Sequence, residues 1–238
     1  MNFWNIVVIG ANRGIGLEFT RQFLTKSKQL KNLIVTTRKE SDELNRLKQS
    51  HQNLHIFNLD VINYDGYKEF VDRITKIVGN DGVDLLVNNA GVAIRSNLET
   101  VTPKDMLTNF EINAVAPLML TKAFLPLLKT ASGARKTVVA NITSRMGSVA
   151  DNGSGSHYAY RASKASMNMI VKSNAVDLKN DQIICLAIHP GWVKTDMGGQ
   201  NALIDTETSV TGMIDVLEKC NADSSGSFVD YNNKIIPY

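Results

Sequence analysis

Tyr160 and Lys164 are the residues whose types and spacing most directly suggest chemistry. Residues four apart on a helix share one face, so an ammonium would lie beside a phenol. A phenol keeps its proton up to pH ~10, and a neighbouring cation lowers that value. Lowering it by about three units takes roughly 4 kcal/mol, which a close lysine and a second cation together can supply. The pair predicts a general acid that works near neutral pH.

Ser144 supplies a hydroxyl upstream of this pair. It follows the apolar run 137–142, which predicts a strand, and open α/β sheets bind ligands at the carboxyl ends of their strands. A polar, glycine-rich segment, 151–158, separates the hydroxyl from the pair. Tyr158 is not the acid, because an alanine stands four positions later, and His157 is either a substrate contact or a surface histidine. Tyr-x-x-x-Lys also occurs on ordinary solvated helix faces, so the surrounding elements must decide its meaning.

Composition favours one globular domain over residues 1–238, because 43% of the residues are hydrophobic and 21% are charged. We expect a cofactor half at roughly 1–130 and a catalytic and substrate half at roughly 131–238. A net charge of +3 is too small to indicate nucleic acid or a membrane as partner. Two cysteines make no disulfide framework, the apolar start has no basic leader, and no histidine has a partner at metal spacing. A cytoplasmic protein without a metal is therefore expected.

A glycine-rich turn follows the first apolar run, 6–9, and precedes apolar residues at helical spacing. Glycines permit a tight turn and close approach of a ligand, and the helix N-terminus offers free amides to a pyrophosphate. The spacing G-x-x-x-G-x-G differs from the commoner G-x-G-x-x-G, and a connection without a ligand is the alternative. The expected cofactor contacts are Gly10, Asn12, Arg13, Gly14, Ile15 and Gly16.

The end of the second expected strand, 33–35, indicates which dinucleotide binds. NAD-binding proteins usually carry an acidic residue there for the ribose hydroxyl, whereas this chain has Thr36, Thr37 and Arg38. A carboxylate would repel a 2′-phosphate, but a guanidinium binds it in a bidentate way. Arg13 in the glycine turn can reach the same phosphate. The missing acid and the two arginines predict NADP (NADPH); the alternative is two exposed arginines at loop ends.

Strands and helices alternate along the rest of the chain, which predicts an α/β fold. Asp60, after the third expected strand at 54–57, either accepts a hydrogen bond from the adenine amino group or caps the next helix. Val61 would offer its amide to the adenine. The other expected helices and strands lie at 40–50, 67–78, 84–87, 183–188, 206–220 and 226–231.

Further motifs complete a family pattern: Asn88-Asn89-Ala90-Gly91 after the fourth strand, then Asn113, Ser144, Tyr160 and Lys164. With the glycine turn, this order resembles the short-chain dehydrogenase/reductase family over almost the whole chain. Segments 151–164 and 189–199 are most similar to sniffer-type carbonyl reductases within it. The resemblance implies a single Rossmann-like doubly wound domain, with a seven-stranded parallel sheet flanked by helices.

The resemblance also implies roles for individual residues. Ser144 and Tyr160 would hydrogen-bond a carbonyl oxygen, and Lys164 would lower the tyrosine pKa and hold the nicotinamide ribose. The backbone carbonyl of Asn113 would hold a water of the proton relay, in a helix that Pro117 should kink. Cofactor contacts are further implied for Asn88, Ala90, Gly91, Tyr160, Lys164, Pro190, Gly191, Val193 and Thr195.

The predicted function is NADPH-dependent reduction of an aldehyde, ketone or quinone, with the tyrosine as general acid. An NAD-dependent alcohol dehydrogenase and a non-catalytic dinucleotide-sensing protein are the alternatives. The short connection between Met197 and the helix near Thr206 predicts a permissive pocket, which Trp192 and Met197 would line unless they serve ordinary packing. The family also implies a homodimer or homotetramer. One departure is Ile9, where the family usually has a threonine, so a stabilising hydroxyl is lost.

Overall fold

The computed structural model describes residues 2–39 and 41–238 and has an all-parallel seven-stranded sheet at its centre, in the order β3-β2-β1-β4-β5-β6-β7. The central strands are short, largely apolar runs, as expected where both faces of a parallel sheet are buried; all five residues of β1 are buried. The edge strand β3 is only partly buried. The fold is the doubly wound Rossmann-like one that was predicted. The strands are β1 (Asn5–Ile9), β2 (Asn32–Thr37), β3 (Leu54–Asn58), β4 (Leu85–Asn88), β5 (Thr137–Ile142), β6 (Ile183–His189) and β7 (Phe228–Asp230).

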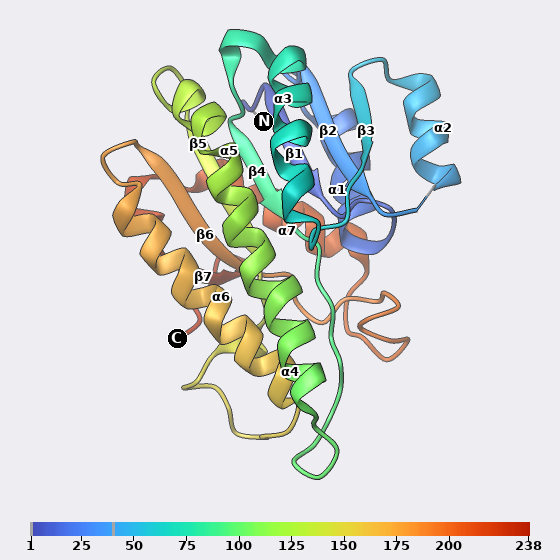
Figure 1. Cartoon of the computed structure of the whole chain (residues 1–238), viewed down its shortest axis with the longest axis vertical. Helices are drawn as coiled ribbons and strands as arrows, with labels where there is room; N and C mark the ends of the chain where they lie inside the picture. Colours follow the sequence, from blue (N-terminus) through green and yellow to red (C-terminus); the bar gives the residue numbers. More distant parts are fainter. Residues whose placement is uncertain (1, 40) are drawn as a thin grey trace.

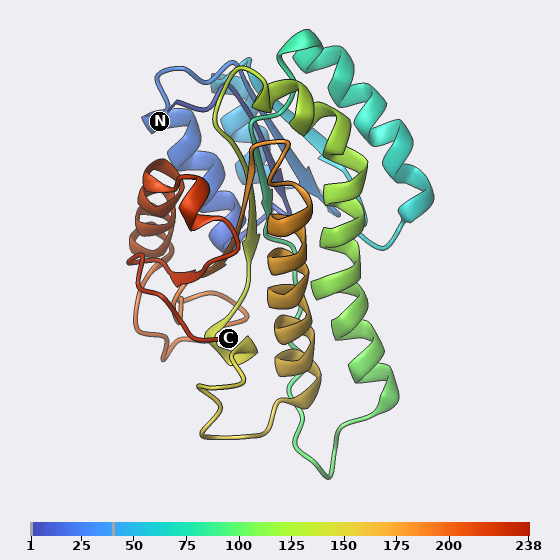
Figure 2. The same ribbon diagram turned by 90° about the vertical axis from the view of Figure 1, so that its left-hand side faces the viewer.

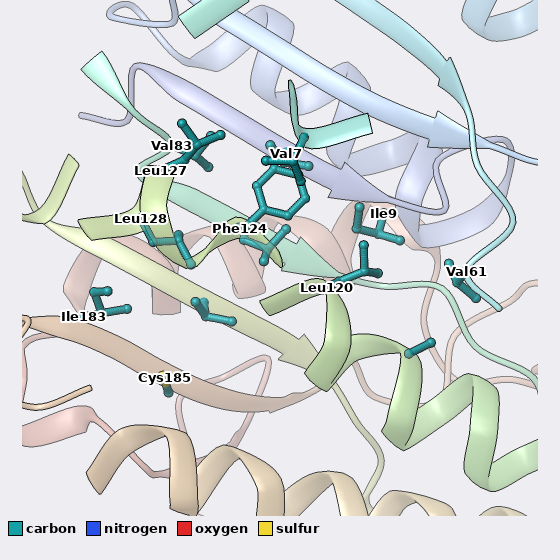
Figure 3. Close-up of a cluster of buried hydrophobic side chains, with 14 of the residues drawn as sticks. Val7, Ile9, Val61, Val83, Leu120, Phe124, Leu127, Leu128, Ile183 and Cys185 are labelled. Atoms are coloured by element: carbon teal, nitrogen blue, oxygen red, sulfur yellow. The ribbon is translucent and has the colours of Figure 1, made fainter. Parts of the chain in front are cut away.

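Helices cover both faces of the sheet (Figures 1 and 2). One face carries α1 (Gly14–Lys26), α2 (Asp42–Ser50) and α7 (Thr206–Lys219), and their apolar residues join those of the strands in one core cluster. The other face carries α3 (Tyr67–Val78), α5 (Ala116–Ser132) and α6 (Tyr158–Asp177), and α4 (Pro103–Phe110) packs against α6. Figure 3 shows Phe124 and Leu120 of α5 packed near Val7 and Ile9 of β1.

Helices α4 and α5 run on as one 30-residue helix, joined by a π-helical turn at Glu111–Val115. This helix is long and apolar enough to cross a membrane by length and composition, with a mean hydropathy of 1.3 in its most apolar window. Half of that window is buried inside the protein, and Leu120, Phe124 and Leu128 lie in the core. The helices that cover a sheet in a protein core pass the same test.

Element ends differ from the expected ones by one or two residues. Helix α2 starts at Asp42 because Ser41 is its N-cap, accepting from the Leu44 amide; residue 40, in the expected range 40–50, lies outside the described residues. Strand β1 begins one residue earlier than expected, at Asn5. This buried amide is tolerated because it donates to the Gly82 carbonyl at 2.8 Å and accepts from Asn32 at 2.8 Å.

Candidate active site

A cleft of about 620 Å³ opens at the carboxyl ends of β1 and β4, the two strands between which the strand order reverses. Connections leave these two strands toward opposite faces, so the chain itself leaves a crevice there. The cleft brings together the glycine turn, the end of β2, the end of β4, helix α6 and the segment after β6. The predicted site residues that line it are Gly10, Asn12, Arg13, Gly14, Ile15, Arg38, Val61, Ala90, Gly91, Tyr160, Lys164, Pro190 and Thr195.

The glycine turn is built for close approach. Gly10 has φ +83°, and a Cβ on Gly16 would lie 2.0 Å from the Gly10 carbonyl oxygen, so the turn folds onto the start of α1. The Gly10 amide donates to the Thr36 hydroxyl at 2.9 Å. Although Ile9 brings no hydroxyl, the neighbouring strand β2 supplies one. Gly16 itself supports the turn from behind and does not line the cleft as the described residues define it.

Four other predicted cofactor contacts also lie outside this lining. The Asp60 carboxylate accepts from the Ile62 amide at 3.3 Å, and the next helical turn has Asn63 at its N-cap, so Asp60 is not its cap either. Asn88 is 3% exposed and turns into the sheet, where it donates to Asn141 at 2.9 Å. Gly191 and Val193 also pack inward: Val193 is 3% exposed.

The cationic end of the cleft is formed by Arg13, Arg38 and Lys39. Arg38 and Lys39 follow β2 directly. The Arg13 guanidinium forms an ion pair across the mouth of the cleft with the Asp196 carboxylate, and these side chains are 69% and 72% exposed. Neither Lys39 nor Asp196 was predicted; each is the direct neighbour of a residue that was.

Ser144, Tyr160 and Lys164 converge on one wall. Ser144 comes after Thr143, the first residue beyond β5. It is 7% exposed, and its hydroxyl accepts a hydrogen bond from the Met146 amide at 3.2 Å. The Lys164 Nζ lies 5.8 Å from the centre of the Tyr160 ring and donates to the Ile142 carbonyl at 2.9 Å. The lysine thus anchors the helix to the end of β5, and its amine reaches the cleft. Ser144 itself lies just behind the lining residues.

Burial dominates the titration of this pair. It raises the pKa of Tyr160, and the hydrogen bond with Ser144 opposes that shift. Burial also lowers the pKa of Lys164 to about 8, because the ammonium loses its hydration. The sequence led us to expect a lowered tyrosine pKa. The groups of this chain by themselves raise the pKa of Tyr160, because the phenol is shielded from water.

The side chain of Asn113 is fully occupied in structural contacts. Its Oδ1 accepts from the Val92 amide at 2.9 Å, and its Nδ2 donates to the Val92 carbonyl at 2.8 Å and to Ser163 at 2.9 Å. Asn113 lies within the π-helical turn. Pro117, four residues later, has no N–H to offer the Asn113 carbonyl, so that oxygen lacks its ordinary α-helical donor. The backbone, and not the amide, is the part of Asn113 open to a further partner.

Several lining residues were not predicted, most of them neighbours in sequence of predicted ones. Asn89 lines the cleft in place of Asn88 and donates to the Gly10 carbonyl at 2.7 Å, which ties β4 to the glycine turn. Met197 lines the cleft, whereas Trp192 instead donates to Gly198 at 2.7 Å. The further unpredicted lining residues are Thr36, Thr37, Leu59, Val92, Ile112, Ile142, Thr143 and Lys194. Among the described residues, no group of three His, Cys, Asp or Glu side chains is arranged to hold a metal ion.

Comparison with known proteins identifies the family. The profile of the short chain dehydrogenase family matches residues 5–203. The carbonyl reductase Sniffer of D. melanogaster is 36% identical, with a TM-score of 0.97 over 100% of both chains. The NADPH-bound carbonyl reductase from chicken fatty liver is 34% identical, with a TM-score of 0.96 over 100% of both chains. The C-signal protein of Myxococcus xanthus is 45% identical over 157 residues, which are 66% of this chain and 93% of that protein. With its fold, its cleft and these similarities, the chain belongs to the short chain dehydrogenase family of oxidoreductases and is sniffer-like within it.

Proposed function

We propose that this protein is an NADPH-dependent carbonyl reductase. The observation that carries the proposal is that Tyr160 and Lys164 line one wall of a cleft that has a cationic group at its other end. Ser144 lies directly behind that wall and hydrogen-bonds Tyr160. The first group suits a polarised carbonyl oxygen and the second suits a phosphate monoester. Two of the most similar solved structures are carbonyl reductases, one of them with NADPH bound, which supports the same function.

In the proposed reaction, the hydroxyls of Ser144 and Tyr160 hydrogen-bond the substrate carbonyl oxygen. Tyr160 gives its proton to that oxygen as negative charge develops on it. The bound NADPH supplies the hydride that reduces the carbonyl carbon. Lys164 places an ammonium beside the phenol and offers it to the nicotinamide ribose. The Asn113 carbonyl would hold a water through which a proton returns to the tyrosine.

Cofactor choice is proposed to rest on Arg38, Lys39 and Arg13, which present positive charge where an NAD-specific site would carry an acid. A 2′-phosphate would pair with these groups, and Arg13 would have to leave Asp196 to join them. Pro190 and Thr195, which line the cleft, would cover the nicotinamide.

We also propose that the protein assembles through α4 and α6. These helices expose the apolar side chains of Leu107 (69%), Phe110 (46%), Met169 (66%) and Val176 (66%). Exposed large apolar side chains gathered on neighbouring helices favour a protein–protein contact.

Replacement of Tyr160 by phenylalanine tests the reaction directly. The Tyr160→Phe variant loses only the acidic hydroxyl, so kcat should fall by at least about 10³-fold while NADPH binding is retained. Turnover is measured as NADPH oxidation with benzaldehyde, acetophenone and menadione, and NADPH binding is measured by fluorescence titration.

Unchanged turnover in Tyr160→Phe would overturn the role of the phenol. A wild-type protein that oxidises alcohols with NAD⁺ in preference to NADP⁺ would favour the alcohol dehydrogenase alternative. NADPH binding without turnover of any carbonyl or alcohol would favour the sensing protein.

A further inference from the structure

The turn that presents Ser144 rests directly on helix α6. A Cβ added to Gly147 would lie 2.7 Å from the carbonyl carbon of Lys164, so there is no room for a side chain between the turn Arg145–Gly147 and the helix. The Gly147 amide donates to the Ser144 carbonyl at 2.8 Å. The position of Ser144 therefore depends on how this turn is held against α6.

Asn168 holds the segment on both sides of Ser144. It stands four residues after Lys164 on the same face of α6 and is 2% exposed. Its Oδ1 accepts from the Thr143 hydroxyl at 2.8 Å, and its Nδ2 donates to the Gly147 carbonyl at 3.3 Å. One buried amide thus fixes the residue before the hydroxyl and the turn after it. Nothing in the proposed reaction uses Asn168.

Arg161, near the start of α6, contacts the same turn. Its Nη1 donates to the Met146 carbonyl at 3.4 Å, and the Met146 amide donates to the Ser144 hydroxyl at 3.2 Å. The other guanidinium nitrogens bind the loop 154–156 at 2.8 to 3.2 Å. The residue after this loop, His157, donates its amide to the Ser96 carbonyl at 2.7 Å. The glycine-rich segment before Tyr160 is thereby fastened to the residue that follows Tyr160.

We infer that Asn168 and Arg161 are positioning residues that hold the Ser144 turn on α6, so that the Ser144 hydroxyl faces the phenol of Tyr160. The inference rests on the proposed reductase function and adds two residues that lie outside the cleft lining. Both hydroxyls that would grip the carbonyl oxygen are then fixed to one rigid helix. Their separation is then set by contacts that α6 makes outside the cleft lining.

Loss of either contact lets the Ser144 hydroxyl turn away from Tyr160. The phenol then loses the hydrogen bond that opposes the upward shift of its pKa. Two measurable effects follow: kcat falls while NADPH binding is retained, and the pH profile of kcat moves to higher pH. Both effects act through Ser144, so they should disappear once Ser144 has been removed.

A double-mutant cycle tests this coupling. Arg161→Met and Asn168→Leu are made singly and on a Ser144→Ala background, and kcat, the KM for NADPH and the pH profile are measured with benzaldehyde, acetophenone and menadione. Each single variant should lose about tenfold in kcat with less than about a twofold change in the KM for NADPH. On the Ser144→Ala background the same changes should alter kcat less than about twofold. Arg161→Lys, which keeps a donor to Met146, should recover part of the loss.

Controls separate this effect from general damage. Arg46→Met on α2 removes an exposed polar group and Ser166→Ala on α6 a half-buried one, and both variants should keep wild-type kcat. Asn168→Leu leaves buried partners unpaired, so its melting temperature is measured; if it does not fold, the partly exposed Arg161 decides the test.

Each outcome is decisive. Wild-type kcat in Arg161→Met, or a loss that repeats in full without Ser144, overturns the inference alone. Absence of wild-type turnover, or wild-type kcat in Ser144→Ala, overturns the proposed function from which it starts.

Discussion

Among single residues, Tyr160 and Lys164 are more strongly held in their neutral forms than the sequence suggests. Burial raises the pKa of the phenol and lowers that of the amine to about 8. For a general acid this direction is useful, since Tyr160 keeps its proton until an oxygen beside it gains negative charge. The second cation required by the sequence-based expectation would have to come from the oxidised nicotinamide.

The buried lysine gives the protein a pH-dependent stability. Its folded pKa of about 8 lies below the ordinary 10.5, so the unfolded chain binds more protons between these values. The free energy of unfolding should therefore rise as pH increases through this window, by up to about 3 kcal/mol. Lys164→Met should lose this rise. The difference between its melting temperature and that of the wild type should therefore be most favourable to the variant below pH 8 and should shift in favour of the wild type toward pH 10.5. Lys172→Met, an exposed change on the same helix, is the control, and a difference that is constant with pH would contradict the prediction.

In the proposed site, Asp196 would compete with the 2′-phosphate of NADPH for Arg13. An exposed ion pair is worth about 0–1 kcal/mol, so Asp196→Asn should tighten NADPH binding by up to about fivefold and leave NADH unchanged. Isothermal titration with both nucleotides measures this. Asp215→Asn, which breaks an exposed pair with Lys219 on α7, should change neither affinity.

A substitution that removes positive charge from the cationic end of the cleft provides a second test of phosphate recognition. Arg38→Asp should weaken NADPH far more than NADH, because it puts a carboxylate where a phosphate is proposed to bind. Equal effects on both nucleotides would refute phosphate recognition by this group.

Among the elements, two short irregular turns position the proposed chemistry. The π-helical turn at Glu111–Val115 lets one long helix pass Pro117 and leaves the Asn113 carbonyl without its usual donor. The turn Arg145–Gly147 follows β5, has Ser144 at its N-cap and packs against α6. Each irregularity lies where a regular helix or strand would have pointed the relevant oxygen elsewhere.

Gly147 sets the distance between the turn Arg145–Gly147 and α6. In Gly147→Ala the new methyl would meet the Lys164 carbonyl carbon and oxygen at 2.7 and 2.8 Å, which no side-chain rotation relieves. We expect a loss of about 1–3 kcal/mol in the free energy of unfolding and a lower kcat. Urea unfolding gives the first and NADPH oxidation the second. Gly133→Ala, where no described atom lies within 4 Å, should keep wild-type values, and an equal loss there would refute the steric explanation.

For the whole molecule, the parallel sheet explains why residues far apart in sequence form one site. All strands end at the same edge, and the reversal of order between β1 and β4 opens the cleft there. Helix α6 covers one face of the sheet, α4 packs against α6, and both helices expose apolar side chains. This second apolar surface is what the proposed assembly would bury.

Assembly through this surface can be tested in solution. Sedimentation should show a dimer or larger species, and Met169→Lys combined with Leu107→Lys should convert it to monomer, because two charges would be buried without partners. Ile235→Lys, at a position that is 81% exposed outside these helices, should leave the assembly intact. A wild-type monomer would contradict the proposal.

The sequence by itself determined the α/β alternation and the strand-to-helix turn at Gly10, and its resemblance to the family added the seven-stranded parallel sheet. The alternation and the turn can be predicted from short segments, because apolar periodicity and glycine spacing act between neighbours in the chain. The helical spacing of Tyr160 and Lys164 was readable for the same reason.

Only the tertiary structure decided that Asn89, and not Asn88, faces the cleft, since successive side chains of a strand leave on opposite sides. It also decided the direction of the Tyr160 pKa shift, which depends on burial by surrounding elements. The pairing of Arg13 with Asp196, 183 positions apart, and the hold of Asn168 on the Ser144 turn arise only when distant segments pack. Their geometry depends on the whole fold, and no local pattern in the sequence encodes it.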